Sequence, residues 1–102
     1  FQEQGDHADE METSLMLYLR PDLVLSKDRW GRGDHKKFKI KAFSEGGVWA
    51  EREWSKISKD TGTGNPEFAS KEKGELFFND VCYEVSKLFT DLCKADLDDL
   101  YE

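Results

Sequence analysis

The stretch HADEMETSLMLYLRPDLV, residues 7–24, decides much of the fold because it contains a complete helix signal. Its apolar side chains follow the i, i+4, i+7, i+8 spacing of a helix with one buried face. They are Met11, Leu15, Tyr18 and Leu19. We expect this helix over residues 8–19, with Asp6 or His7 as its cap. Pro21 ends it, because a residue that precedes proline is pushed out of helical geometry.

A second and longer helix is expected towards the other end of the chain. An Asn-Pro pair at 65–66 has the character of a helix cap, and the helix should settle by Ser70 and continue to about Lys94. Its apolar positions form a stripe that we interpret as a core or subunit contact. Cys82 and Cys93 lie on this helix and are expected to be buried thiols in a reducing compartment, too far apart to bridge each other.

Between the two helices the sequence predicts loops and one strand. Residues 27–37, KDRWGRGDHKK, are charged and interrupted by glycine, which is typical of a surface loop. Residues 38–43, FKIKAF, alternate apolar and basic side chains, as a half-exposed strand does. The range 27–47 should therefore be a charged surface loop and a strand. A short extended piece is expected at 23–25, and KDTGTGNP, residues 59–66, gives the strongest loop signal.

Composition limits the chain to one domain and excludes two classes of partner. The chain has 102 residues, of which 36% are charged, and its formal net charge is -7. This charge repels nucleic acid and anionic lipid, and no apolar run reaches the roughly 18 residues of a membrane span. We therefore expect neither partner, and the reduced thiols expected above favour a cytoplasmic location. Because two apolar stripes with so little between them do not close a core, residues 1–102 are interpreted as one partial domain.

The acidic start of the first helix contains the best candidate for chemistry. The cluster consists of Asp6, His7, Asp9, Glu10 and Glu12. A histidine beside carboxylates can perform general acid–base catalysis near neutral pH, but acids at a helix start also simply favour the helix dipole. The second histidine, His35, is 28 residues away, and the chain contains no HExxH, His-x-His or CxxC motif. Composition alone leaves both readings open.

The three tryptophans are a second group with two interpretations. They are Trp30, Trp49 and Trp54. Their rings could line a pocket, whereas tryptophan in so small a chain more often belongs to a core or an interface. Ser14 and Ser70 lack the G-x-S-x-G context of a serine nucleophile, and GTGNP, residues 62–66, lacks the Lys-Ser/Thr of a phosphate loop.

Two motifs resemble segments of one enzyme family. Residues 7–24 closely resemble the His-Ala-Gly-x-x-Glu-Thr-Ser segment of the creatininase (creatinine amidohydrolase) family, which typically continues into Leu-Arg-Pro-Asp-Leu-Val. Residues 61–89, TGTGNPEFASKEKGELFFNDVCYEVSKLF, resemble the closing segment of that family, where a glycine turn and Asp/Asn-Pro lead into Ala-Thr/Ser-x-Glu-Lys-Gly and the C-terminal helix. The motifs occur in the family's order and spacing, and together they cover about half of the chain.

The resemblance implies an α/β fold and a metal-dependent reaction. The chain would be the C-terminal part of a three-layer α/β/α fold with a mainly parallel sheet, usually assembled as a hexamer. The implied reaction is hydrolysis of a cyclic amide or other non-peptide C–N bond, in a small-molecule substrate, at two zinc or manganese ions. The family's ligand motifs, Glu-x-His and His-x-Glu, are absent here. No metal ligand is therefore expected in this chain, which would need the remainder of the same enzyme for activity.

The resemblance also assigns residues to roles. His7 matches the histidine that the family uses for proton transfer or carbonyl polarisation, and it is expected in the loop just before the helix. Glu12 matches the glutamate that supports the site, and Asp6 is a weaker candidate for orienting groups there or binding substrate. Asp9 replaces the family's glycine, and residues 1–6 lack the tryptophan of creatinine-cleaving members, so creatinine itself is not predicted as the substrate. The alternative is a non-catalytic interaction or assembly module.

Overall fold

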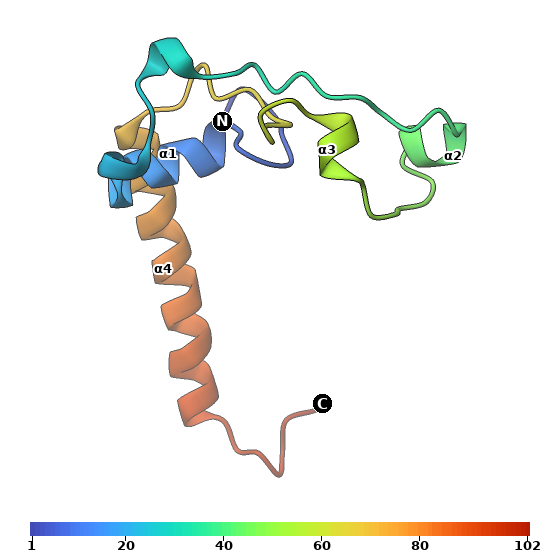
Figure 1. Ribbon diagram of the computed structural model, residues 1–102. Coiled ribbons are helices and arrows are strands. Elements are labelled where there is room, and N and C mark those ends of the chain that lie inside the picture. Colours follow the sequence, from blue (N-terminus) through green and yellow to red (C-terminus); the bar gives the residue numbers. More distant parts are fainter.

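The computed structural model describes residues 1–102 as helices joined by loops (Figure 1). The helices in chain order are α1 (Glu10–Leu19), η1 (Pro21–Leu23), η2 (Lys27–Arg29), α2 (Lys41–Ser44), α3 (Trp54–Ile57) and α4 (Lys71–Lys94), where η marks a 3-10 turn. The one β pairing is an isolated antiparallel bridge between His35 and Ser58. The chain therefore contains no sheet, and the expectation of an α/β fold with a parallel sheet is wrong for these residues.

The expected strand at 38–43 shows why no sheet forms. A strand is stable only when a neighbouring strand supplies partners for its backbone groups. No such strand lies beside this segment, and the amides of Phe43 and Ser44 instead donate to the carbonyl of Ile40, which begins the turn of α2. The rings of Phe38 and Phe43 pack on each other at 5.0 Å between centroids. The short extended piece expected at 23–25 is likewise only partly extended, because Leu23 ends η1.

Helix α1 forms where the sequence predicts it, but a different residue caps it. Asp9 is the N-cap, and its Oδ1 accepts a hydrogen bond of 2.9 Å from the amide of Glu12. Neither Asp6 nor His7 has this role, because the backbone reaches helical geometry only at Glu10. Arg20 closes the helix immediately before Pro21, as expected.

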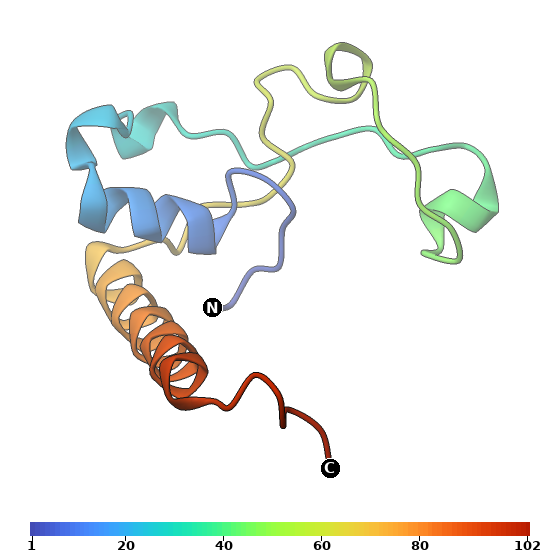
Figure 2. The same ribbon diagram turned by 90° about the horizontal axis from the view of Figure 1, so that it is seen from below.

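Helices α1 and α4 cross at very short distance near the beginning of α4 (Figures 1 and 2). Gly74 allows this approach, because a Cβ atom there would overlap the carbonyl oxygen of Ser14. The Ser14 hydroxyl donates to the carbonyl of Glu10 at 2.6 Å and accepts from the amide of Ser70 at 3.1 Å. The crossing thus joins the two predicted helices through backbone contact and buried hydrogen bonds.

The start of α4 differs from the expected Asn-Pro cap. Ser70 is the N-cap, and its hydroxyl accepts from the amide of Lys73. Asn65 instead closes a local turn, because its side chain accepts from the amide of Glu67 at 3.1 Å. The predicted limits near Ser70 and Lys94 are confirmed, and residues 59–66 form a loop as predicted.

Little apolar surface is buried within the chain. Eight residues are buried, and the hydrophobic core among them consists of Ala69. The apolar stripe of α4 is largely exposed. Cys82 and Cys93 are also exposed, so the expectation of buried thiols is wrong and no longer indicates a reducing compartment. The radius of gyration is 18.4 Å, against about 13 Å for a compact domain of this length. No helix combines the length and the apolar character needed to cross a membrane.

Candidate functional site

His7 lies in the turn that leads into α1. Ala8 has a left-handed backbone with φ 54°, a conformation that costs a residue with a Cβ about 1 kcal/mol or more. The turn is held from inside α1, because the Glu12 carboxylate accepts from the amide of Ala8 at 2.6 Å. With the Asp9 cap this forms a variant of the capping box, in which the third helical residue reaches back before the cap. Glu12 therefore fixes the backbone on which His7 stands.

The same carboxylate faces the imidazole of His7. The Oε2 atom of Glu12 lies 3.5 Å from Nδ1 of His7, which is longer than a hydrogen bond and short enough for an ion pair when the ring is protonated. Both side chains are about half exposed, and the carbonyl of His7 accepts from the amide of Thr63 at 3.0 Å. The carboxylate favours a proton on Nδ1, which leaves Nε2 as the nitrogen free to exchange a proton with a substrate.

Asp6 forms an ion pair with Arg52 and has no contact of this kind with His7. The guanidinium of Arg52 also lies 4.8 Å from the ring centroid of Trp54. The ring of Trp54 meets the imidazole of His7 edge-on, with centroids 5.4 Å apart and an interplanar angle of 68°. Arg52 and Trp54 thus contact two residues of the turn before the α1 cap, Asp6 and His7.

Glu10 anchors this end of α1 to α4. Its side chain is fully buried, and its carboxylate accepts from the amides of Gln2 and Glu3 and from Nζ of Lys73 at 2.5 Å. Burial alone would raise the pKa of Glu10. The hydrogen bonds from Lys73, Glu3 and Gln2, with the charge of the Lys73 ammonium, outweigh burial and lower the pKa to about 2. Glu10 is therefore an ionised structural anchor and has no role as a proton donor near neutral pH.

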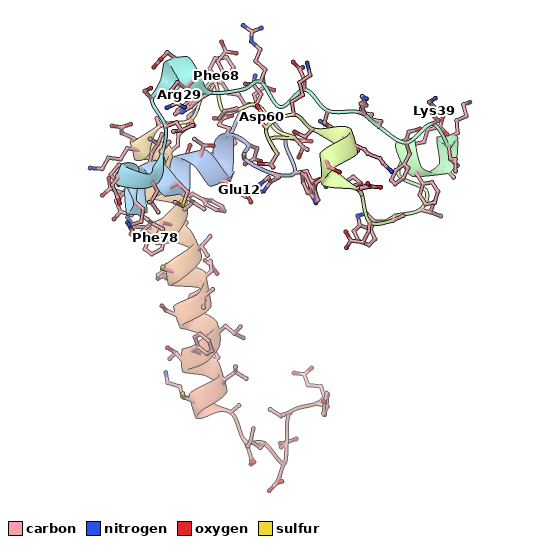
Figure 3. The ribbon with its side chains drawn as sticks, viewed as in Figure 1. Glu12, Arg29, Lys39, Asp60, Phe68 and Phe78 are labelled. Atoms are coloured by element: carbon pink, nitrogen blue, oxygen red, sulfur yellow. The ribbon has the colours of Figure 1, made fainter.

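A cavity of about 380 Å³ lies beside His7. Its polar lining comes from three segments of the chain, namely His7, Glu12 and Thr13 from the start of α1, Arg29 from η2, and Asp60 from the loop before α4. Met16, Leu23 and Trp30 give part of it an apolar surface, and the indole of Trp30 is fixed by a 2.7 Å hydrogen bond to the carbonyl of Leu25. Figure 3 shows Glu12 and Asp60 close together in this region, whereas Lys39 lies far away beside α2.

The described side chains do not assemble a metal site. No group of three or more His, Cys, Asp and Glu side chains lies close enough together to hold a metal ion. His7 and Glu12 form a pair without a third ligand, and the other acids of the cluster are engaged, Asp9 in the helix cap and Glu10 with Lys73. The residues of this chain therefore do not by themselves form a metal site.

Comparison with known proteins defines the class. The sequence profile of the creatininase family, described as creatinine amidohydrolase, matches residues 1–89. The chain therefore belongs to the creatininase family, whose members are hydrolases and are generally metal-dependent.

A solved structure agrees with this membership. The chain superposes with a TM-score of 0.86 on the crystal structure of a Bacteroides fragilis protein that carries the provisional name creatinine amidohydrolase. The two sequences are 37% identical, and the superposition covers 100% of this chain and 39% of that chain. The chain thus spans about two fifths of the length of this relative. No curated protein sequence matches it.

The structure adds site residues that the sequence did not reveal. Arg52, Trp54 and Lys73 each contact a member of the acidic cluster from at least 40 residues away in the chain. Trp54 was one of three equivalent tryptophans, and no local pattern separates it from Trp49, which is 77% exposed. Lys73 carried a weak signal, because it stands in the Glu-Lys-Gly of the closing motif.

Proposed function

We propose that this chain contributes the acid–base residue of a creatininase-type amidohydrolase, which hydrolyses a cyclic amide or other non-peptide C–N bond in a small molecule. The observation that carries the proposal is the His7–Glu12 pair beside the cavity. Membership of the family supports the reaction class, and the contact between His7 and Glu12 supports the choice of residues. The catalytic residue is His7, and Glu12 orients it.

The chemistry follows from the two nitrogens of the ring. Hydrolysis of an amide adds water across the C–N bond, and the departing nitrogen must gain a proton as the bond breaks. His7 gives that proton from Nε2, while the Glu12 carboxylate at 3.5 Å from Nδ1 stabilises the charged imidazolium from which the proton leaves. Such proton transfer contributes about 10²–10⁴ in rate. His7 lies in a turn that Glu12 of α1 holds through the amide of Ala8, so the donor needs little reorganisation.

The rest of the machinery lies outside this chain in our proposal. Two zinc or manganese ions would be bound by the remainder of the same enzyme, and a hexamer is the expected assembly. The Bacteroides fragilis relative has more than twice the length of this chain, which leaves room for such ligands. Creatinine is tested because the relative bears its name, although residues 1–6 lack the tryptophan of creatinine-cleaving members.

The test is a His7→Ala substitution in the intact enzyme, assayed against a panel of small cyclic amides that includes creatinine. Turnover should fall about 100-fold, because the proton donor is lost, while metal content per subunit stays unchanged. His35→Ala is the matched control, because His35 is the other histidine and its ring contacts the carbonyl of Gly33 instead of the acidic cluster. Retention of activity within about threefold in His7→Ala would contradict the proposal.

One observation favours the alternative of an assembly module. Helix α4 has a row of exposed large apolar side chains beyond the α1 crossing, among them Leu88, Phe89 and Leu92. Such a surface is typical of a protein contact. The alternative is supported if the intact protein hydrolyses no amide in the assay above with metal supplied, and if Phe89→Ser disrupts its assembly.

A further inference from the structure

We propose that Trp54 and Arg52 are positioning residues for His7, and that they hold the imidazole so that Nδ1 faces Glu12 and Nε2 is left for the substrate. The proposal rests on the catalytic role of His7 proposed above. It gives a function to part of residues 48–58, a segment to which neither the motifs nor the family's site residues assign one.

The first argument is the contact between the two rings. Trp54 meets His7 edge-on at 5.4 Å between centroids, a favourable arrangement for aromatic rings. His7 lines the cavity and Trp54 does not, so the indole contacts the imidazole outside the space where a substrate would lie. Trp54 can therefore restrict the ring of His7 without competing with the substrate.

The second argument is that Arg52 holds Trp54 in its contact with His7. Arg52 stacks on Trp54 at 4.8 Å and pairs with the carboxylate of Asp6, the residue next to His7. Its side chain is 24% exposed and that of Asp6 is 60% exposed, so the guanidinium is the more buried member of the pair. The contacts run from Asp6 through Arg52 and Trp54 to His7 and close a ring through the backbone.

The third argument is that His7 needs such restraint. Its side chain is 49% exposed, and its one side-chain partner besides Trp54 is Glu12 at 3.5 Å, beyond hydrogen-bonding distance. An imidazole held this loosely would rotate and exchange the places of its two nitrogens. A catalytic donor displaced by about 1 Å can lose about 100-fold in rate, so a second contact that fixes the ring has a direct chemical use.

Nitrogen-15 NMR of the histidine rings in the intact protein tests the proposal. In the unaltered protein, neutral His7 should carry its proton mainly on Nδ1. In Trp54→Ala the two tautomers of His7 should approach the mixture of a free imidazole, and the ring protons of His7 should change chemical shift because the ring current of the indole is lost. His35 is an internal standard, because its Nδ1 lies 2.8 Å from a carbonyl oxygen that only accepts.

Three further variants separate positioning from general structural damage. Trp54→Phe should restore the tautomer preference of His7, because an aromatic edge is retained. Arg52→Ala should shift the tautomers in the same direction as Trp54→Ala, by a smaller amount. Trp49→Ala, an exposed tryptophan of the same segment, should leave both histidines unchanged. If Trp54→Ala and Arg52→Ala leave the tautomers of His7 unchanged, the proposal is wrong.

Activity measurements distinguish this proposal from the proposed function. If both hold, Trp54→Ala lowers kcat about tenfold with KM nearly unchanged, and Trp54→Phe recovers most of the loss. If His7→Ala keeps its activity, the catalytic role fails, yet the NMR result still shows whether Trp54 orients the ring. A loss of activity in Trp54→Ala without any change in the tautomers of His7 overturns the positioning role alone.

Discussion

The α1/α4 crossing and the outer part of α4 differ in which side chains they bury. At the crossing, the buried groups are mainly polar or backbone groups, including Glu10, Ser14 and Gly74, and nearly all have partners within the chain. On the outer part of α4, large apolar side chains such as Leu88 and Phe89 are exposed. The polar groups at the crossing thus find their partners within this chain, so the crossing can hold His7 in place. The outer part of α4, in contrast, presents an apolar surface that needs a partner.

The largest expected change in stability comes from adding a side-chain atom at the α1/α4 crossing. Gly74→Ala places a methyl group on the carbonyl oxygen of Ser14, so α1 and α4 must separate and lose their shared hydrogen bonds. We expect loss of more than about 4 kcal/mol in the free energy of unfolding, measured by denaturant titration of the helical circular dichroism. Gly47→Ala is the control, because its Cβ would make only ordinary contact. Equal stability of the two variants would refute the close approach.

The second effect concerns the buried charge of Glu10. Glu10→Gln leaves the Lys73 ammonium without its anion, and we expect a loss of about 3 kcal/mol at neutral pH in the same titration. Glu75→Gln, on the exposed side of α4, should change stability by less than about 0.5 kcal/mol. A Glu10 variant as stable as the Glu75 variant would show that the ion pair does not anchor α1.

The pH dependence of stability gives an independent check on Glu10. Its pKa is lowered from 4.5 to about 2, so the folded protein favours the ionised form more strongly than the unfolded chain does. This contribution, roughly 3 kcal/mol, is fully present above about pH 4.5 and is lost as pH falls towards 2. Acid titration of unfolding should show that loss in the unaltered protein and a smaller one in Glu10→Gln.

The smallest effect compares two phenylalanines of α4. Phe78 is partly buried and packs against the ring of Tyr18 from α1 at 5.8 Å, whereas Phe89 is 61% exposed. Phe78→Ala should cost roughly 1–2 kcal/mol, and Phe89→Ala less than about 0.5 kcal/mol. If Phe89→Ala is the more damaging change in the intact protein, the outer part of α4 is packed against a partner that contributes to stability.

The sequence predicts local structure well where the signal is local. The spacing of Met11, Leu15 and Tyr18 predicts α1, and Pro21 predicts its end, because both depend on contacts within one or two turns. The cap was assigned wrongly, since Asp6, His7 and Asp9 are all capable caps and only the backbone decides among them.

The features that the sequence could not predict depend on contacts between residues that lie far apart in the chain. An apolar stripe such as that of α4 predicts a buried face but says nothing about where the covering residues come from, so the exposed state of Cys82 was missed. The alternation at 38–43 is typical of a strand, yet a strand requires a neighbour that these residues lack. His7 and Glu12 could be assigned together because both belong to one short motif that resembles the creatininase family, while Trp54 could only be placed in three dimensions.

The most direct test of the account is a double-mutant cycle on turnover in the intact enzyme, with His7→Ala, Glu12→Gln and both together. The account predicts that Glu12→Gln alone lowers kcat about tenfold, His7→Ala about 100-fold, and the double variant no more than His7→Ala, because Glu12 acts through His7. Multiplying effects in the double variant would contradict it and assign Glu12 a separate role.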